Sequence, residues 1–200
     1  YEHIDQPSNE IDEILDSLND LVKMGKIRYI GLSNETPWGT MKFLHHSNIS
    51  STPRVQSIQN AYNLLNRTFE IGGSEIAHRE DVGLLAYSPL AQGYLTGKYQ
   101  NGKLPKGSRK ELFNRLQRYE GPYAEEAIED YLTVAKKYSI DPSQLANQFV
   151  TTRPFVTSNI IGATSMEQIK LAVTSNEVDL TEEIENEIEK AFQKHGNVAS

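Results

Sequence analysis

Cysteine is absent from this 200-residue sequence, as are long apolar segments and long runs of lysine or arginine. Without cysteine there is no disulfide framework, no thiolate metal site and no cysteine nucleophile, and no other metal site is indicated. No apolar stretch approaches the roughly 20 residues of a membrane span, and no signal-peptide pattern opens the sequence. The net charge of −7 argues against nucleic acid and anionic membranes as partners. We therefore expect a cytoplasmic protein with neither partner.

Three short apolar runs are each followed by polar or ring-bearing residues. They are residues 27–32 before Ser33-Asn34-Glu35, 55–58 before Gln59-Asn60-Ala61-Tyr62, and 83–86 before Tyr87-Ser88-Pro89-Leu90. A parallel strand is buried along its body and presents ligand-binding side chains at its carboxyl end. Three such runs in order indicate one ligand face built from three strand ends.

Segments with helical spacing of apolar residues alternate with these runs. A polar stretch at 100–120 indicates a loop or lid, and a fourth short apolar run, Ile160-Ile161, precedes Gly162-Ala163-Thr164. Helices are expected over residues 8–25, 36–44, 70–80, 123–138, 141–150, 165 onward and 181–192, with N-terminal signals at Ser8, Thr36, Asp141, Ser165 and Thr181.

This alternation predicts an α/β fold with a parallel sheet. The chain is shorter than the roughly 250 residues of a complete (β/α)8 barrel, and four strands alone would leave two open edges. We therefore expect further strands upstream in the parent protein or in another chain.

Three segments carry a resemblance to a known family. They are GKIRYIGLSNE at 25–35, IQNAYNLLNR at 58–67 and LAYSPLAQGYLTGKY at 85–99. With these motifs the chain resembles the aldo-keto reductase superfamily, and within it the Tas-like branch, over about residues 10–189. That family forms a (β/α)8 barrel and reduces aldehydes or ketones with NADP(H), using a tetrad of Asp, Tyr, Lys and His.

The resemblance implies that residues 1–200 are a partial aldo-keto reductase domain whose N-terminal half is missing. The expected fold is the C-terminal half of a TIM barrel, strands five to eight, with a C-terminal helix. The Asp, Tyr and Lys of the tetrad would then lie outside this chain, no catalytic residue is assigned within it, and the isolated chain is expected to be inactive.

The resemblance also implies roles for residues at the nicotinamide end of the cofactor. Ser33, Asn34 and Gln59 match the contacts to the nicotinamide carboxamide, which offers both a donor and an acceptor. Tyr87 matches the aromatic residue that stacks on the nicotinamide ring. From the residues alone, Ser33 and Asn34 fit a turn before a helix better than a ligand contact, Gln59 fits a solvated strand end, and Tyr87 fits a residue that caps the core.

Further matches concern the phosphates of the cofactor. The pyrophosphate loop would comprise Ser88, Pro89, Leu90, Gln92, Gly93 and Lys98. Gly93 allows close backbone approach, and Lys98 supplies a charge, although a lysine alone also fits a solvated surface. Gly162, Thr164 and Gln168 match the turn and helix N-terminus that hold the 2′-phosphate. Leu171-Ala172 depart from the usual adenine contact, which leaves the preference for NADP over NAD open.

The histidines carry no assigned chemistry. His3 fits either the family's catalytic histidine or a histidine of an insert found in the Tas-like branch. His45, His46, His78 and His195 are expected on the surface.

The predicted function of the parent protein is NADP(H)-dependent reduction of a small-molecule carbonyl compound by hydride transfer, with this chain forming the nicotinamide and pyrophosphate cradle. Two alternatives stay open. One is a cofactor-binding regulatory or interaction protein without turnover, and the other is an inactive truncated product. The sequence indicates neither the substrate nor the oligomeric state.

Overall fold

A computed structural model describes residues 11–113 and 117–199, without the side chain of Gln117. The strands are β1 (Ile30–Ser33), β2 (Val55–Ala61), β3 (Gly83–Tyr87) and β4 (Val156–Ile160). The helices are α1 (Ile11–Lys23), α2 (Pro37–Ser50), α3 (Gly73–Glu80), α4 (Arg109–Phe113), α5 (Ala124–Lys137), α6 (Pro142–Thr151), α7 (Met166–Thr174) and α8 (Glu182–His195). Short 3₁₀ helices are η1 (Thr68–Glu70), η2 (Ala91–Thr96), η3 (Gln100–Gly102), η4 (Gln117–Tyr119) and η5 (Ser175–Glu177).

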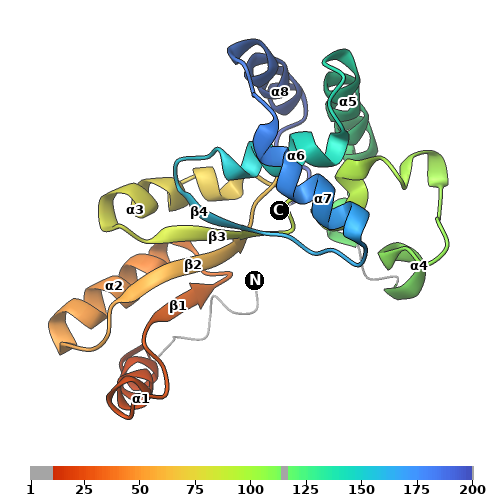
Figure 1. The fold of residues 1–200 in the computed structure, drawn as a ribbon. Helices are drawn as coiled ribbons and strands as arrows, with labels where there is room; N and C mark the ends of the chain where they lie inside the picture. Colours follow the sequence, from red (N-terminus) through yellow and green to blue (C-terminus); the bar gives the residue numbers. More distant parts are fainter. Residues whose placement is uncertain (1–10, 114–116, 200) are drawn as a thin grey trace.

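The four strands form one parallel sheet in the order β1-β2-β3-β4, so neighbours in sequence are neighbours in the sheet. Helices α2 and α3 lie along β2 and β3, α6 contacts β4, and α5 packs against α8 beyond α6 (Figure 1). This arrangement confirms the predicted α/β class. In the described residues the sheet is open, with β1 and β4 as its edges.

Two strand boundaries differ from the sequence prediction. The first strand begins at Ile30 rather than at 27, because Lys26 and Ile27 donate their backbone N–H groups to the Leu21 carbonyl and so complete the end of α1. The fourth strand is Val156–Ile160 and lies mostly before the predicted Ile160-Ile161. Its polar centre and exposed position at the sheet edge explain why an apolar run did not mark it.

Most predicted helix N-termini are confirmed. Side-chain oxygens of Thr36, Asp141, Ser165 and Thr181 each accept a backbone N–H of the first turn. Ser8 lies outside the described residues. The third helix starts at Gly73 rather than at 70, because residues 68–70 form η1 and Gly72 enters the helix with a φ of 86°. The predicted loop at 100–120 contains η3, α4 and η4.

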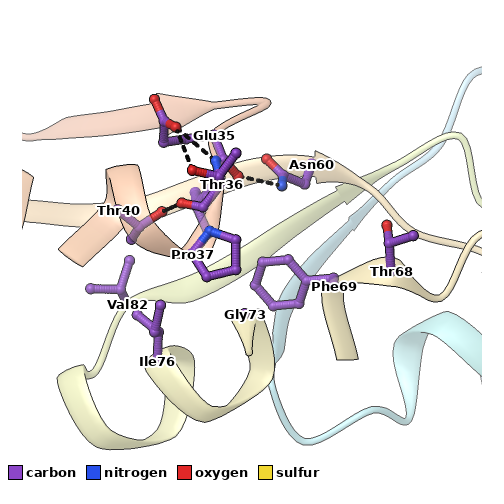
Figure 2. A pocket seen from close by; sticks show the side chains of 11 residues that line it. Glu35, Thr36, Pro37, Thr40, Asn60, Thr68, Phe69, Gly73, Ile76 and Val82 are labelled. Carbon is purple, nitrogen blue, oxygen red and sulfur yellow. Dashed lines mark hydrogen bonds between the residues drawn. The ribbon is translucent and has the colours of Figure 1, made fainter. Parts of the chain in front are cut away.

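A cavity of about 220 Å³ lies between the sheet, α2 and α3 (Figure 2). Pro37, Phe69 and Ile76 contribute apolar lining, and Asn60 lines it from β2. Asn60 Nδ2 donates to the Glu35 carbonyl at 3.1 Å, whereas its buried Oδ1 has no partner among the described residues. None of the described lining residues is a predicted cofactor contact, so this cavity is separate from the predicted site.

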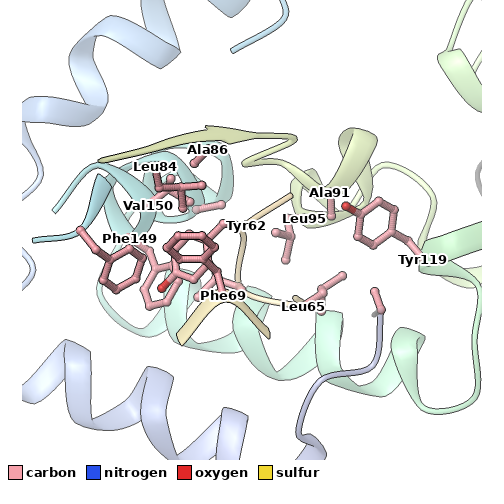
Figure 3. Close-up of a cluster of buried hydrophobic side chains, with 14 of the residues drawn as sticks. Tyr62, Leu65, Phe69, Leu84, Ala86, Ala91, Leu95, Tyr119, Phe149 and Val150 are labelled. Carbon is pink, nitrogen blue, oxygen red and sulfur yellow. The ribbon is translucent and has the colours of Figure 1, made fainter. Parts of the chain in front are cut away.

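The hydrophobic core combines buried residues of the sheet with residues of helices α1, α2, α3, α5, α6 and α8. Tyr62 is fully buried, stacks on Phe149 with ring centroids 5.8 Å apart, and meets Phe155 edge-on at 5.2 Å. Figure 3 shows that this aromatic group continues past Leu65 and Leu95 to Ala91 and Tyr119. The segment after β2 and the loop after β3 therefore share one core, which fixes the positions of both strand ends.

A partly buried ion-pair network joins the segment after β2 to α8. The Arg67 side chain donates to both carboxylate oxygens of Glu70 at 2.7 and 2.8 Å and to Glu189 at 2.8 Å. Its guanidinium lies 4.0 Å from the ring centroid of Phe192. Tyr62 donates to Glu70 at 2.6 Å, and burial raises the pKa of Tyr62 so that this hydroxyl keeps its proton.

One histidine prediction is wrong. The His195 side chain is only 5% exposed, and its Nε2 lies 2.7 Å from Asp130 Oδ2, which also accepts from Lys194 at 2.7 Å. The sequence did not predict this burial of His195 because its partner, Asp130 on α5, is 65 residues away along the chain. His45 and His78 are exposed, and half-buried His46 is paired with Asp12 at 2.6 Å.

None of the described helices combines the length and the apolar character that a membrane crossing requires.

Candidate functional site

The carboxyl ends of β1, β2 and β3 bring the predicted nicotinamide contacts onto one side of the sheet. Ser33 is the register partner of Gln59, which is in turn the partner of Leu85. Partners in a parallel sheet project to the same face, and so do residues two apart along a strand. Ser33, Gln59 and Tyr87 therefore share a face. The Asn34 N–H donates to the Gln59 carbonyl at 2.9 Å, which joins the first two strand ends.

A hydrogen-bonded chain connects the side chains at this face. The Tyr87 hydroxyl donates to Asn34 Oδ1 at 2.7 Å, and Asn34 Nδ2 donates to Ser33 Oγ at 3.2 Å. Arg118 Nη1 donates to the Tyr87 hydroxyl at 3.3 Å. This contact raises the pKa of Arg118 further above its usual range, so the guanidinium stays charged. Three of the predicted residues thus meet, together with one that was not predicted.

The backbone of this face is unusual for non-glycine residues. Asn34, Ser88, Ala91 and Gln92 have φ values of 54°, 59°, 48° and 58°. Each such residue costs on the order of 1 kcal/mol or more, and strained backbone concentrates at ligand sites. Four of the nine described non-glycine residues with positive φ lie in the predicted site segments. This concentration supports a functional rather than a purely structural loop after β3.

Asn63, in the segment after β2, is hydrogen-bonded to the loop after β3. This side chain is fully buried and donates to the Ser88 carbonyl at 2.9 Å and to the Tyr119 hydroxyl at 3.1 Å. Its Oδ1 accepts from the backbone N–H groups of Leu65 and Asn66 at 3.0 and 3.1 Å. All four hydrogen-bonding positions of the Asn63 amide are therefore used, and one of them ties the loop after β3 to the segment after β2. In this loop Pro89 is buried and Leu90 is half-buried.

Gly93 and Lys98 are in direct contact. Gly93 has a φ of 100°, and a Cβ atom placed on it would lie 2.8 Å from Lys98 Cε and 2.9 Å from Nζ. The ammonium group also lies 5.1 Å from the ring centroid of Tyr99. The close approach that Gly93 allows is therefore that of the Lys98 side chain, which is held beside the loop.

The turn between β4 and α7 forms a second group of predicted residues. Gln168 Oε1 accepts from the Thr164 N–H at 2.8 Å and lies 3.3 Å from Thr164 Oγ1. Gly162, Thr164 and Gln168 are all exposed. β4 brings this turn beside β3, since Tyr87 is the register partner of Ile160. In this structure Gln168 acts as a cap on the turn, so the Thr164 amide already has a partner.

The residues present fit a nicotinamide nucleotide. The strand ends offer hydroxyl and amide groups next to the half-buried ring of Tyr87. In the loop after β3, the ammonium group of Lys98 lies against Gly93. In that loop Gln92 Oε1 is buried and has no hydrogen-bond partner among the described residues. An unpaired buried acceptor is costly, and a ligand N–H or O–H group would satisfy it.

Sequence reasoning missed three residues of this site: Arg118, Asn63 and Tyr119. Burial raises the pKa of Tyr119, which keeps its hydroxyl protonated beside Asn63. A signal existed only for Asn63, because asparagines commonly bond to backbone groups two residues ahead in turns. Arg118 and Tyr119 lie in the polar stretch at 100–120, where no spacing rule pointed to the strand ends.

A catalytic histidine and a metal ion are the two other features to consider at an active site. His3 lies outside the described residues. In residues 11–113 and 117–199 no group of three or more acidic or histidine side chains is placed to hold a metal ion, and no such site was predicted.

Comparison with known proteins shows similarity along most of the sequence. The protein named Tas of Escherichia coli is 45% identical over 187 residues, which are 94% of this chain and 54% of that protein. A Babesia bovis protein named aldo-keto reductase is 37% identical over 199 residues, 96% of this chain and 70% of that protein. Escherichia coli L-glyceraldehyde 3-phosphate reductase is 31% identical over 176 residues, 85% and 50% of the two chains. The chain thus spans about half the length of Tas.

The family model described as "Aldo/keto reductase family" matches residues 1–193. The prediction that the chain is only the C-terminal half of the barrel is therefore wrong, because the family match runs from the first residue to residue 193. The superfamily resemblance is confirmed. By this match over nearly its whole length, the chain belongs to the aldo/keto reductase family.

Proposed function

We propose that the protein carrying this chain is an NADP(H)-dependent reductase of aldehydes or ketones. The observation that carries the proposal is the hydrogen-bonded chain from Ser33 through Asn34 to Tyr87 at the ends of the parallel strands. Family membership supports it, as does a relative named for the reduction of an aldehyde, L-glyceraldehyde 3-phosphate.

The nicotinamide carboxamide would bind to Ser33, Asn34 and Gln59. Asn34 Oδ1 is already used by Tyr87, so Asn34 offers the remaining N–H of its amide as a donor, while the Ser33 hydroxyl and the Gln59 amide complete the set. The ring of Tyr87 would stack on the nicotinamide, since its hydroxyl is fixed from two sides and its rotation is restricted.

The pyrophosphate would lie along the loop formed by Ser88, Pro89, Leu90, Gln92 and Gly93, with Lys98 as the nearby charge. Gly162, Thr164 and Gln168, at the start of the nine-residue α7, would hold the adenosine end with its 2′-phosphate. The bound cofactor supplies the hydride. These residues would hold and orient the cofactor so that one face of its nicotinamide is open to a carbonyl substrate.

The proposal is tested with the intact protein, NADPH or NADH, and a panel of aldehydes and ketones. Consumption of the reduced cofactor is followed by its absorbance at about 340 nm. Turnover with NADPH that exceeds turnover with NADH supports the full proposal. Tight NADPH binding without turnover of any carbonyl compound would favour a cofactor-binding regulatory protein, and absence of binding to either nucleotide overturns the proposal.

A further inference from the structure

Arg118 lies at the same strand ends as the predicted nicotinamide contacts. Its Nη1 donates to the Tyr87 hydroxyl at 3.3 Å, and that hydroxyl donates to Asn34 at 2.7 Å. The contact joins residues 31 apart in sequence, so it results from the tertiary fold and not from local geometry.

The backbone around Arg118 is held on one side by two neighbours. Tyr119 is 1% exposed and bonded to Asn63, which also holds the loop after β3. Glu120 accepts from Tyr94 at 2.5 Å and pairs with Lys110 at 2.7 Å, and the Lys110 contact lowers the pKa of Glu120. Since both neighbours are anchored to other elements, the backbone at Arg118 is fixed beside the strand ends, and the bond to Tyr87 orients its guanidinium there.

The charge of Arg118 is not neutralised within the described part of the chain. No described carboxylate oxygen lies within 4.0 Å of its guanidinium, whereas Arg54, Arg67 and Arg153 each pair with a glutamate. The Arg118 side chain is exposed at the edge of the site. In a chain with a net charge of −7, an unpaired cation beside a ligand face raises the local concentration of anions.

The chemistry of the guanidinium defines what it would bind. It carries five N–H donors in a planar fork, and Tyr87 uses one of them. The free donors match the paired oxygens of a carboxylate or a phosphate. A neutral carbonyl compound offers no such pair of oxygens.

We propose that Arg118 binds an anionic group, a carboxylate or a phosphate, on the ligand that lies against Tyr87. The proposal rests on the proposed function, which places the nicotinamide against that ring. The anionic group belongs either to the carbonyl substrate or to the nucleotide, and the two sources give different kinetic results.

The test compares Arg118→Met and Arg118→Lys with the unaltered intact protein. Arg79→Met is the matched control, because Arg79 is an exposed arginine on α3 that pairs only with Glu75 in the described structure. The substrate pair is 4-carboxybenzaldehyde and its methyl ester, which differ by one negative charge. The dissociation constants of NADPH and NADH are measured separately, without substrate, by protein fluorescence.

If the substrate carries the anion, Arg118→Met raises KM for the carboxylate substrate by roughly 10- to 100-fold and leaves the ester unchanged. If the nucleotide carries it, Arg118→Met raises the dissociation constants of both nucleotides by a similar factor and affects both substrates equally. Arg118→Lys restores part of the loss in either case, because it keeps the charge but not the fork.

Equal behaviour of Arg118→Met and Arg79→Met in all these measurements overturns the inference. Should the unaltered protein bind neither nucleotide, the proposed function fails, and titration with inorganic pyrophosphate and with 4-carboxybenzaldehyde still tests Arg118 directly. If only Arg118→Met loses binding of these anions, the proposed anion site is supported. If Arg118→Met and Arg79→Met bind them equally, the proposal is overturned.

Discussion

Tyr87, the last residue of β3, donates its hydroxyl hydrogen bond to Asn34, the first residue after β1, at 2.7 Å. The bond spans the whole of β2, which lies between these strands in the sheet. It holds an aromatic ring and a carboxamide in a fixed relation at the face where the cofactor is proposed to bind. The ring and the hydroxyl of Tyr87 therefore have separable roles.

Replacing Tyr87 by alanine should weaken nucleotide binding by roughly 1–3 kcal/mol, because the stacking surface is lost. Tyr87→Phe keeps the ring and removes only the hydroxyl bonds to Asn34 and Arg118, so it should cost less than half of that amount. Both values are obtained by fluorescence titration with NADPH. Unchanged affinity in Tyr87→Ala would remove Tyr87 from the nucleotide site.

Gly93→Ala should destabilise the loop after β3. A φ of 100° is unfavourable for alanine, and the new Cβ, 2.8 Å from Lys98 Cε, would push the flexible end of the lysine side chain aside. We expect a loss of about 1–3 kcal/mol in the free energy of unfolding and weaker nucleotide binding as Lys98 is displaced.

The control for this change is Gly162→Ala, since nothing lies within 4 Å of a Cβ at that position. Its stability should stay within about 0.5 kcal/mol of the unaltered protein in urea unfolding. Equal losses of stability in both variants would contradict the argument from the left-handed backbone of Gly93.

Arg67→Met should be strongly destabilising, because it leaves Glu70 and Glu189 without the cation that they share. Breaking a fully buried pair costs about 3–5 kcal/mol, and the partial exposure of both Glu70 and Glu189 places the expected value at or below the lower end of that range. Arg79→Met, which breaks an exposed pair on α3, should cost less than about 0.5 kcal/mol. Chemical unfolding of the two variants under one set of conditions measures the difference.

The stability contributed by Asp130 should depend on pH. Lys194 and His195 hydrogen-bond to this carboxylate and lower its pKa below the ordinary value of 3.8. A lowered pKa means that the unfolded state binds the proton more readily, so the contribution is complete above pH 3.8 and is lost as the pH falls through the lower, folded-state pKa.

The comparison is between the unaltered protein and Asp130→Asn, with the free energy of unfolding measured at pH 7 and at a series of acidic values. The variant should be less stable at pH 7, and the difference should shrink as the pH falls below 3.8. A difference that is constant over the whole range would contradict this account.

Strand positions and helix starts could be predicted from the sequence where the signal lies in neighbouring residues. The apolar runs that precede Gln59 and Tyr87 located β2 and β3, and cap residues such as Thr36 and Asp141 marked helix starts, because capping depends on atoms within three residues. The bounds of β4 were misplaced toward Ile160 because Thr157 and Ser158 lie exposed at a sheet edge, where burial selects no apolar side chain.

Features that depend on distant partners were not predictable in this way. Arg118 meets Tyr87, and His195 meets Asp130, only after helices and strands pack, and neither position has a distinctive neighbouring sequence. The assignment of the chain to the C-terminal half of a barrel, made from the resemblance and the number of strands, was also wrong, since the family match begins at residue 1. The clustering of Asn34, Ser88 and Gln92 in left-handed backbone was equally invisible in the sequence, since none of them is a glycine.

The hydrogen bonds of the strand-end site also bear on the order of folding. The bond from Tyr87 to Asn34 spans 53 residues and the bond from Arg118 to Tyr87 spans 31. Closing such loops costs entropy before any contact is gained, and parallel strand pairing is intrinsically slow. Helices can therefore form early, whereas the site exists only once all the strands have paired. Nucleotide binding by this protein would thus report the completion of its sheet, and a folding intermediate rich in helix would not bind.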